Sequence, residues 1–139
     1  MELKDCLNMM VNIRNNINTQ WSYYFLLVTI TIGWLLLPDK TGSPLLLSGS
    51  LKALGTVGLF LFAALNILGL TDMYRMLQIL TEEAQAIDGA SWRSETGRTW
   101  IQRTSYRNRV RVVWAIHLSV GLVLLILIWW DDIRFLKHP

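Results

Sequence analysis

One histidine lies inside a long uncharged run, VVWAIHLSVGLVLLILIWW, and it is the residue of this chain that most invites a chemical role. His117 stands five residues after Val112, where this run begins, and Asn66 stands five residues before Thr71, where an earlier uncharged run ends. If both runs are helices, a rise of about 1.5 Å per residue puts the two side chains at a similar depth. Tyr24 of the first uncharged run falls at a matching depth. We therefore predict an intramembrane polar layer of Asn66, His117 and Tyr24.

Three kinds of chemistry are open to this layer. The first is a hydrogen bond between helices, which in membrane proteins contributes about 0.6 kcal/mol on average. The second is proton or ion transfer, because histidine titrates near neutral pH. The third is haem ligation by His117, but the only other histidine, His138, lies past the far end of the same run, so a pair of axial histidines requires another chain. We favour the hydrogen bond and expect no cofactor. The chain has a single cysteine, Cys6, which excludes a cysteine-rich metal site.

The elements that must position these residues are three uncharged stretches. The chain has 139 residues, of which 53% are hydrophobic and only 17% charged. Each stretch approaches the roughly 20 apolar residues that cross a bilayer as a helix. We predict an all-α integral membrane protein of one domain, with three transmembrane helices at residues 21–37, 53–71 and 112–130.

The rest of the chain predicts further helices. Residues 1–20 have the pattern of an amphipathic helix, whose apolar stripe consists of Leu3, Cys6, Met10, Ile13 and Ile17. Residues 72–111 predict a cytoplasmic helical hairpin. Its first helix has an apolar stripe of Met73, Met76, Leu77, Leu80 and Ala84, and a glycine stop at Asp88-Gly89. Its second has Ser91 or Ser94 as its N-cap, and we expect it to be continuous, or nearly so, with the third span. Gly97 is its weakest point, and Trp92, Trp100 and Ile101 lie over the stripe.

The placement of charge predicts the orientation of the chain. Nine of the 13 lysines and arginines lie before the first span or within residues 72–111, and four lie in the connection at 38–52 or after the third span. Cytoplasmic segments carry an excess of basic residues. We therefore predict an N-terminus in the cytoplasm, a C-terminus outside, and a bacterial inner membrane as the location.

Small residues favour close helix contacts. Gly55, Gly58 and Gly69 recur with Asn66 at helical spacing, and Gly121 lies one turn from His117. Membrane helices prefer such residues where they pack together. These four glycines are therefore predicted to be helix-packing positions.

A basic face is predicted on the second helix of the hairpin. Arg103, Arg107 and Arg111 recur every four residues, which suits contact with anionic lipid headgroups or an acidic partner. Nucleic acid is not expected, because the same segment holds five acidic residues: Asp72, Glu82, Glu83, Asp88 and Glu95.

No hydrolase, phosphate-loop or dinucleotide motif occurs in the sequence, so we expect no enzyme. The favoured function is helix contact, as an accessory subunit of a membrane complex or as a homo-oligomer. One alternative is an oligomeric ion or proton channel lined by Asn66 and His117. A less favoured alternative is the membrane anchor of a redox complex.

Overall fold

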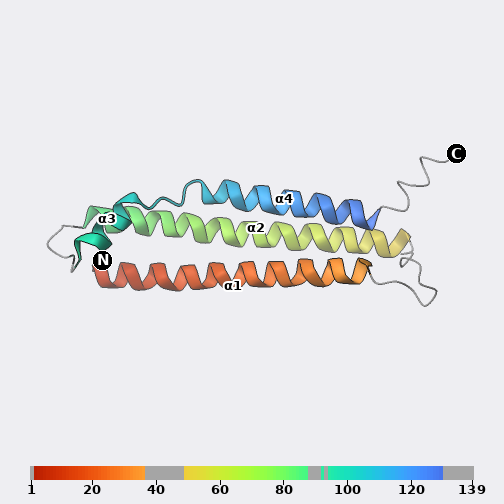
Figure 1. Ribbon diagram of the computed structural model, residues 1–139, viewed down its shortest axis with the longest axis horizontal. Coiled ribbons are helices and arrows are strands. Elements are labelled where there is room, and N and C mark those ends of the chain that lie inside the picture. Colours follow the sequence, from red (N-terminus) through yellow and green to blue (C-terminus); the bar gives the residue numbers. More distant parts are fainter. Residues whose placement is uncertain (1, 37–48, 88–91, 93, 130–139) are drawn as a thin grey trace. The chain divides into compact units, whose positions relative to one another are not determined.

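Helices are the only regular secondary structure of the described residues. The computed structural model describes residues 2–36, 49–87, 92 and 94–129, and these residues contain no strand. The four helices are α1 (Leu3–Leu36), α2 (Gly49–Ala86), α3 (Glu95–Arg103) and α4 (Arg109–Ile128), as Figure 1 shows. The predicted all-α class is confirmed for this part of the chain.

Helix α1 joins two segments that the sequence predicted as separate elements. It runs without interruption through the amphipathic segment at 1–20 and the uncharged segment at 21–37. The first proline of the chain, Pro38, follows two residues after the end of α1. A proline biases the residue before it away from the helical conformation, so the sequence itself disfavours a helix through this point.

Helix α2 likewise continues from the uncharged stretch into the first half of the predicted hairpin. It has 38 residues and contains no proline. The continuity predicted from the sequence at this junction is therefore confirmed. The predicted glycine stop at Asp88-Gly89 lies outside the described residues.

The second hairpin helix and the third uncharged stretch do not form one continuous helix, because α3 and α4 are separated by residues 104–108. Ser94 is the N-cap of α3, and its hydroxyl accepts a hydrogen bond from the Gly97 N–H at 3.3 Å. Gly97, predicted as the weak point, lies inside α3. The helix ends instead at Arg103, with Thr104 as its C-cap in an extended conformation (φ −81°, ψ 132°), and α4 begins only at Arg109.

Two glutamines of α2 account for this break. The Tyr106 N–H donates to Oε1 of Gln78 at 2.7 Å, and Nε2 of Gln85 donates to the Ile101 carbonyl at 2.9 Å. A backbone group that leaves a helix needs a new partner, and α2 supplies one on each side of Thr104. The break is therefore stabilised by residues 16 and 28 positions earlier in the chain.

The contacts divide the chain into two compact units. Unit 1 comprises Met1–Trp21 and Leu68–Val113, and unit 2 comprises Ser22–Ile67 and Trp114–Pro139. Helices α1, α2 and α4 each contribute to both.

The core of unit 1 follows the predicted stripe of α1. Its fully or nearly buried residues are Cys6, Met10 and Ile17 from α1, Leu70, Thr71, Leu77, Leu80, Thr81 and Ala84 from α2, Ile101 from α3 and Val113 from α4. Two predicted members of the hairpin core differ: Met76 is 55% exposed and Trp100 is 52% exposed. Thr81, which is not part of the predicted stripe, is fully buried. Its hydroxyl donates to the Leu77 carbonyl at 2.7 Å.

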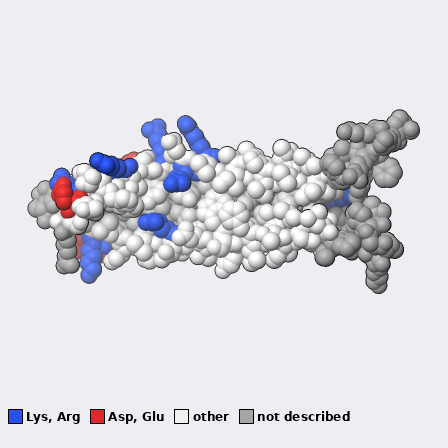
Figure 2. Space-filling view, viewed as in Figure 1, with Lys and Arg blue, Asp and Glu red and all other residues white. Residues whose placement is uncertain are grey.

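Unit 2 is apolar inside and outside. Its buried side chains include Tyr24, Ile67, Leu124 and Ile128, and many large apolar residues face outward, such as Leu54, which is 70% exposed. Lys52 is the only lysine, arginine, aspartate or glutamate among the described residues of this unit. On the face shown in Figure 2, charged side chains gather over part of the described surface and leave a broad stretch uncharged.

Two of the described helices, α2 and α4, are long and apolar enough to cross a membrane. The uncharged part of α1 is less apolar, because it contains serine, threonine and tyrosine among its leucines and isoleucines. The sequence predicted this part of α1 as the first of the three spans.

Candidate functional site

The structure brings together Tyr24, Asn66 and His117 in unit 2, and we call these three residues the polar cluster. Nε2 of His117 lies 3.0 Å from Oδ1 of Asn66. The Tyr24 ring lies against the His117 ring, with 4.1 Å between centroids and 36° between planes. The Phe62 ring lies parallel to the Tyr24 ring, with 6.2 Å between centroids. His117 is only 2% exposed and Tyr24 only 3%, whereas Asn66 is half-buried.

Each member of the cluster occupies the inward face of its helix. On α4, the buried residues of unit 2 are His117, Leu124 and Ile128, at spacings of seven and four. On α2, Phe62 and Asn66 are one turn apart. These spacings are those of side chains that share one helical face. The same periodicity that buries leucines therefore also buries the histidine.

The contact is a hydrogen bond between a histidine ring nitrogen and an amide oxygen. Because an amide oxygen only accepts, this orientation of the Asn66 amide corresponds to the tautomer of His117 in which Nε2 donates. A buried polar group without a partner costs about 1 to 3 kcal/mol, and this bond removes that cost for the histidine N–H and the amide oxygen. The arrangement supports a structural contact between α2 and α4 within unit 2.

The described residues hold no group of three His, Cys, Asp or Glu side chains that could bind a metal ion together.

The four predicted packing glycines have different surroundings. A Cβ atom built on Gly69 would lie 3.0 Å from Nε2 and 3.2 Å from Oε1 of Gln20, so the glutamine amide of α1 packs directly on this glycine in unit 1. At Gly55, Gly58 and Gly121, the same construction meets nothing within 4 Å outside the glycine's own stretch of helix. Only Gly69 therefore receives a close contact from another helix of the described chain.

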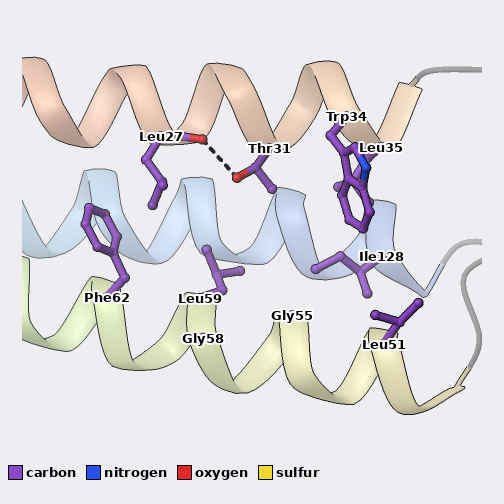
Figure 3. Close-up of a pocket in the computed structure, with 10 residues that line it drawn as sticks. All are labelled: Leu27, Thr31, Trp34, Leu35, Leu51, Gly55, Gly58, Leu59, Phe62 and Ile128. Atoms are coloured by element: carbon purple, nitrogen blue, oxygen red, sulfur yellow. Dashed lines mark hydrogen bonds between the residues drawn. The ribbon is translucent and has the colours of Figure 1, made fainter.

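Gly55 and Gly58 instead form part of the wall of an apolar cavity in unit 2 (Figure 3). The cavity has a volume of about 390 Å³ and lies between residues of α1 and α2, with Ile128 of α4 at one side. Its one hydroxyl, that of Thr31, donates to the Leu27 carbonyl at 2.8 Å. The cavity therefore offers an apolar surface and little hydrogen-bonding capacity.

A polar contact near the first turn of α2 was missed from the sequence. Nε1 of Trp129 donates to the Thr56 hydroxyl at 3.1 Å, and Nζ of Lys52 lies 5.8 Å from the centroid of the Trp129 ring. Lys52 is only 5% exposed. A cation over a tryptophan face is attracted by the ring quadrupole, so this charge is stabilised inside unit 2. The spacing of lysine and tryptophan, 77 residues apart, gave no signal for it.

The predicted arginine face is divided by the break in the helix. Arg103 lies in α3, Arg107 in the turn, and Arg111 in α4, so the spacing of four does not place them along one helix. Arg103 instead lines a second cavity, in unit 1, together with Arg14 and Arg109. The spacing of residues along one helix does not reveal Arg14 and Arg109 as neighbours of Arg103, because they come from other helices.

Cys6 is also part of the packed interior of unit 1. Its Sγ donates to the Leu80 carbonyl at 3.2 Å, and the side chain has no exposed surface. Burial, and secondarily the nearby Glu83 carboxylate, raise the pKa of this thiol above its ordinary value. The thiol is therefore held in its neutral form.

Two features of the described chain could carry function: the polar cluster with the apolar cavity in unit 2, and the arginine-lined cavity in unit 1. The chain matches no protein-family model, no curated protein and no solved structure.

Proposed function

We propose that the chain is a three-span membrane protein that works through helix contacts, either as an accessory subunit of a membrane complex or as a homo-oligomer. The observation that carries the proposal is the surface of unit 2. Its described residues include a single charged side chain, and large apolar side chains such as Leu54, Leu65 and Leu118 are 60% to 70% exposed. A soluble monomer rarely exposes so extended an apolar surface, whereas lipid is a suitable solvent for it.

The proposal includes the first uncharged stretch, residues 21–37, as a span, and α1 continues through this stretch to Leu36. This part of α1 is uncharged, and Tyr24 packs against Phe62 of α2 and His117 of α4, the two helices that are apolar enough to cross a membrane. The threonine hydroxyls of α1 return to its own backbone, as at Thr29 and Thr31. An uncharged helix with its hydroxyls satisfied internally can be accommodated in hydrocarbon.

The orientation in the proposal follows from the charges of unit 1. Fourteen of the fifteen described charged residues belong to this unit, eight of them basic, and Lys52 is the other. A cytoplasmic location of unit 1 agrees with the general excess of basic residues on that side. The remaining detail, a bacterial inner membrane with the C-terminus outside, is part of the same proposal.

The proposed helix contacts depend on the open glycines of unit 2. Gly55 and Gly58 meet no other helix of the described chain, and they line the apolar cavity between α1 and α2. Glycine permits the close backbone approach that drives membrane helices together in the absence of a hydrophobic effect. These two positions are therefore where we expect another helix to approach.

The channel alternative has less support from the geometry. The donor atom of His117 is engaged by Asn66, and the ring is covered by Tyr24. A conducting path along these residues would require the three side chains to separate. Haem ligation through Nε2 would require the same bond to break, so the redox-anchor alternative is weakened as well.

The test is the mass and composition of the protein purified in mild detergent and measured by native mass spectrometry. We expect either several copies or a complex with other subunits. Gly55→Leu with Gly58→Leu should release the single chain. Gly33→Leu is the matched control, because Gly33 also has open space around it but does not line the cavity. A single chain without partners in the unmodified protein would contradict the proposal.

A further inference from the structure

The arginine-lined cavity of unit 1 is built from all four helices and the turn before α4. It has a volume of about 470 Å³. Its basic side chains are Arg14 of α1, Arg103 of α3 and Arg109 of α4, and its other polar side chains include Asn18, Tyr74 and Ser105. Residues from distant parts of the chain thus place three positive charges around one space.

No described carboxylate neutralises these three arginines. The ion pairs of the described residues involve other arginines, Arg75 with Asp72 at 3.9 Å and Arg98 with Glu95 at 4.0 Å. The cavity lining contains no aspartate or glutamate. A guanidinium is always charged and offers five donors but no acceptor, so it cannot bond to another guanidinium. The cavity therefore provides donors and positive charge for an acceptor that carries negative charge.

The start of α4 adds to the same potential. Helix starts normally favour acidic residues, because the first backbone N–H groups form the positive end of the helix dipole. The first turn of α4 contains no acidic residue, and Arg109 and Arg111 both lie in it. An anion in the cavity would offset this accumulation of positive charge.

The cavity also lies at a definite distance from the uncharged stretches. Asn18 precedes Trp21 by three residues, Tyr74 follows Thr71 by three, and Arg109 precedes Val112 by three. On each helix this is about 4.5 Å along the axis from the edge of an uncharged stretch. If those stretches cross the membrane, as proposed above, the cavity lies at the level of the lipid headgroups.

We propose that this cavity binds a phosphate group, with Arg14, Arg103 and Arg109 as its ligands. Guanidinium binds phosphate through paired hydrogen bonds, and basic pockets beside membrane helices bind phospholipid headgroups. The phosphate belongs either to an anionic phospholipid or to a free phosphate compound. The lipid source depends on the proposed membrane location, but the phosphate chemistry does not.

The experiment uses the full chain in nanodiscs of phosphatidylcholine. In one arm, phosphatidic acid or phosphatidylglycerol is added to the nanodiscs, and the retained lipid is identified by native mass spectrometry. In the other arm, inorganic phosphate and pyrophosphate are titrated by calorimetry. Selective retention of the anionic lipid supports a headgroup site, and saturable binding of the free anions supports a soluble ligand.

Single substitutions test the residues. Arg14→Gln and Arg109→Gln should each weaken binding at least about tenfold, since a charge-assisted pair of bonds is lost. Arg109→Lys should weaken it by less, because lysine keeps the charge but not the planar pair of donors. Arg75→Gln is the matched control, since it removes one positive charge outside the cavity, and it should change binding less than twofold.

The proposal is overturned if neither anion class binds, or if Arg75→Gln weakens binding as much as the cavity variants do. Circular dichroism and melting temperature identify a variant that has not folded, and Arg109→Lys is the milder replacement in that event. Extraction of the chain by alkaline carbonate would refute the membrane location. Binding of free phosphate would still support the cavity in that case, so the two proposals fail separately.

Discussion

Nε2 of His117 and Oδ1 of Asn66 lie 3.0 Å apart, between two helices that are each apolar enough to cross a membrane. This hydrogen bond joins residues 51 positions apart in the chain, and the Tyr24 ring lies against the His117 ring. Its contribution to stability can be measured separately from any role in transport.

A double-mutant cycle measures this contribution. Asn66→Ala and His117→Ala should each lower the free energy of unfolding, with a coupling of about 0.6 kcal/mol and at most about 1.7 kcal/mol. Unfolding is followed by circular dichroism in detergent. Ser119→Ala, at an exposed position of α4, is the control and should have little effect. Additive effects of the two substitutions would show that the bond contributes nothing.

Larger side chains at two glycine positions should have opposite effects on the stability of the protein. Gly69→Leu should destabilise the protein by about 1–3 kcal/mol, because the Gln20 amide occupies the space its side chain needs. Gly33→Ala should be neutral or should stabilise by up to about 1 kcal/mol, because its Cβ meets nothing and alanine favours helix. Melting temperatures check both, and the reverse order would contradict the packing described for Gln20.

The break before α4 depends on Gln78. Gln78→Ala should cost about 1 kcal/mol and should speed hydrogen exchange at the Tyr106 N–H, which loses its acceptor. Gln102→Ala is the control, since the Gln102 side chain is exposed on α3. If exchange at Tyr106 is unchanged, the turn is not stabilised by this contact.

The raised pKa of the Cys6 thiol predicts a loss of stability of the folded protein at alkaline pH. Its pKa is raised above the ordinary value of 9.0 in the folded protein, mainly by burial. The unfolded chain therefore gives up this proton at a lower pH than the folded chain does. The resulting stabilisation is complete below the unfolded pKa and is lost as the pH rises through the folded pKa.

The measurement for Cys6 is the melting temperature from pH 8 to pH 10.5, compared with that of Cys6→Ala. The unmodified protein should lose more stability over this range than the variant loses. Iodoacetamide should modify the thiol slowly at pH 8, because the side chain has no exposed surface. Rapid modification would show that the α1 contact with Leu80 opens readily.

The proposed topology can be tested with single cysteines in a Cys6→Ala background. Arg75→Cys should react with a membrane-impermeant maleimide only after the cells are opened, because the proposal places unit 1 in the cytoplasm. Lys40→Cys, in the connection proposed to lie outside, should react in intact cells. Labelling of position 75 in intact cells would contradict the orientation.

The sequence predicted best what depends on helix geometry alone. Counting residues from the ends of the uncharged stretches placed Asn66, His117 and Tyr24 at one depth, and the structure brings these residues together. The rise per residue is a property of the backbone, so this kind of prediction needs no knowledge of tertiary contacts.

The features that the sequence did not predict depend on partners far along the chain. The end of α3 at Thr104 is stabilised by Gln78 and Gln85 of α2, and no local residue marks it as a stop. Spacing identified Gly55 and Gly69 equally, but only the structure shows that one is open and the other covered by Gln20. The cavity arginines belong to three helices, so periodicity along one helix could not group them.

The near absence of charge in unit 2 has an electrical consequence. If this unit lies in a membrane, Lys52 beside Trp129 is the only described lysine, arginine, aspartate or glutamate on which the transmembrane voltage can act. Moving one elementary charge through a full 100 mV changes the free energy by about 2.3 kcal/mol. A rearrangement of the described residues of unit 2 would therefore be nearly insensitive to the membrane potential, unless the lysine leaves its place over the tryptophan.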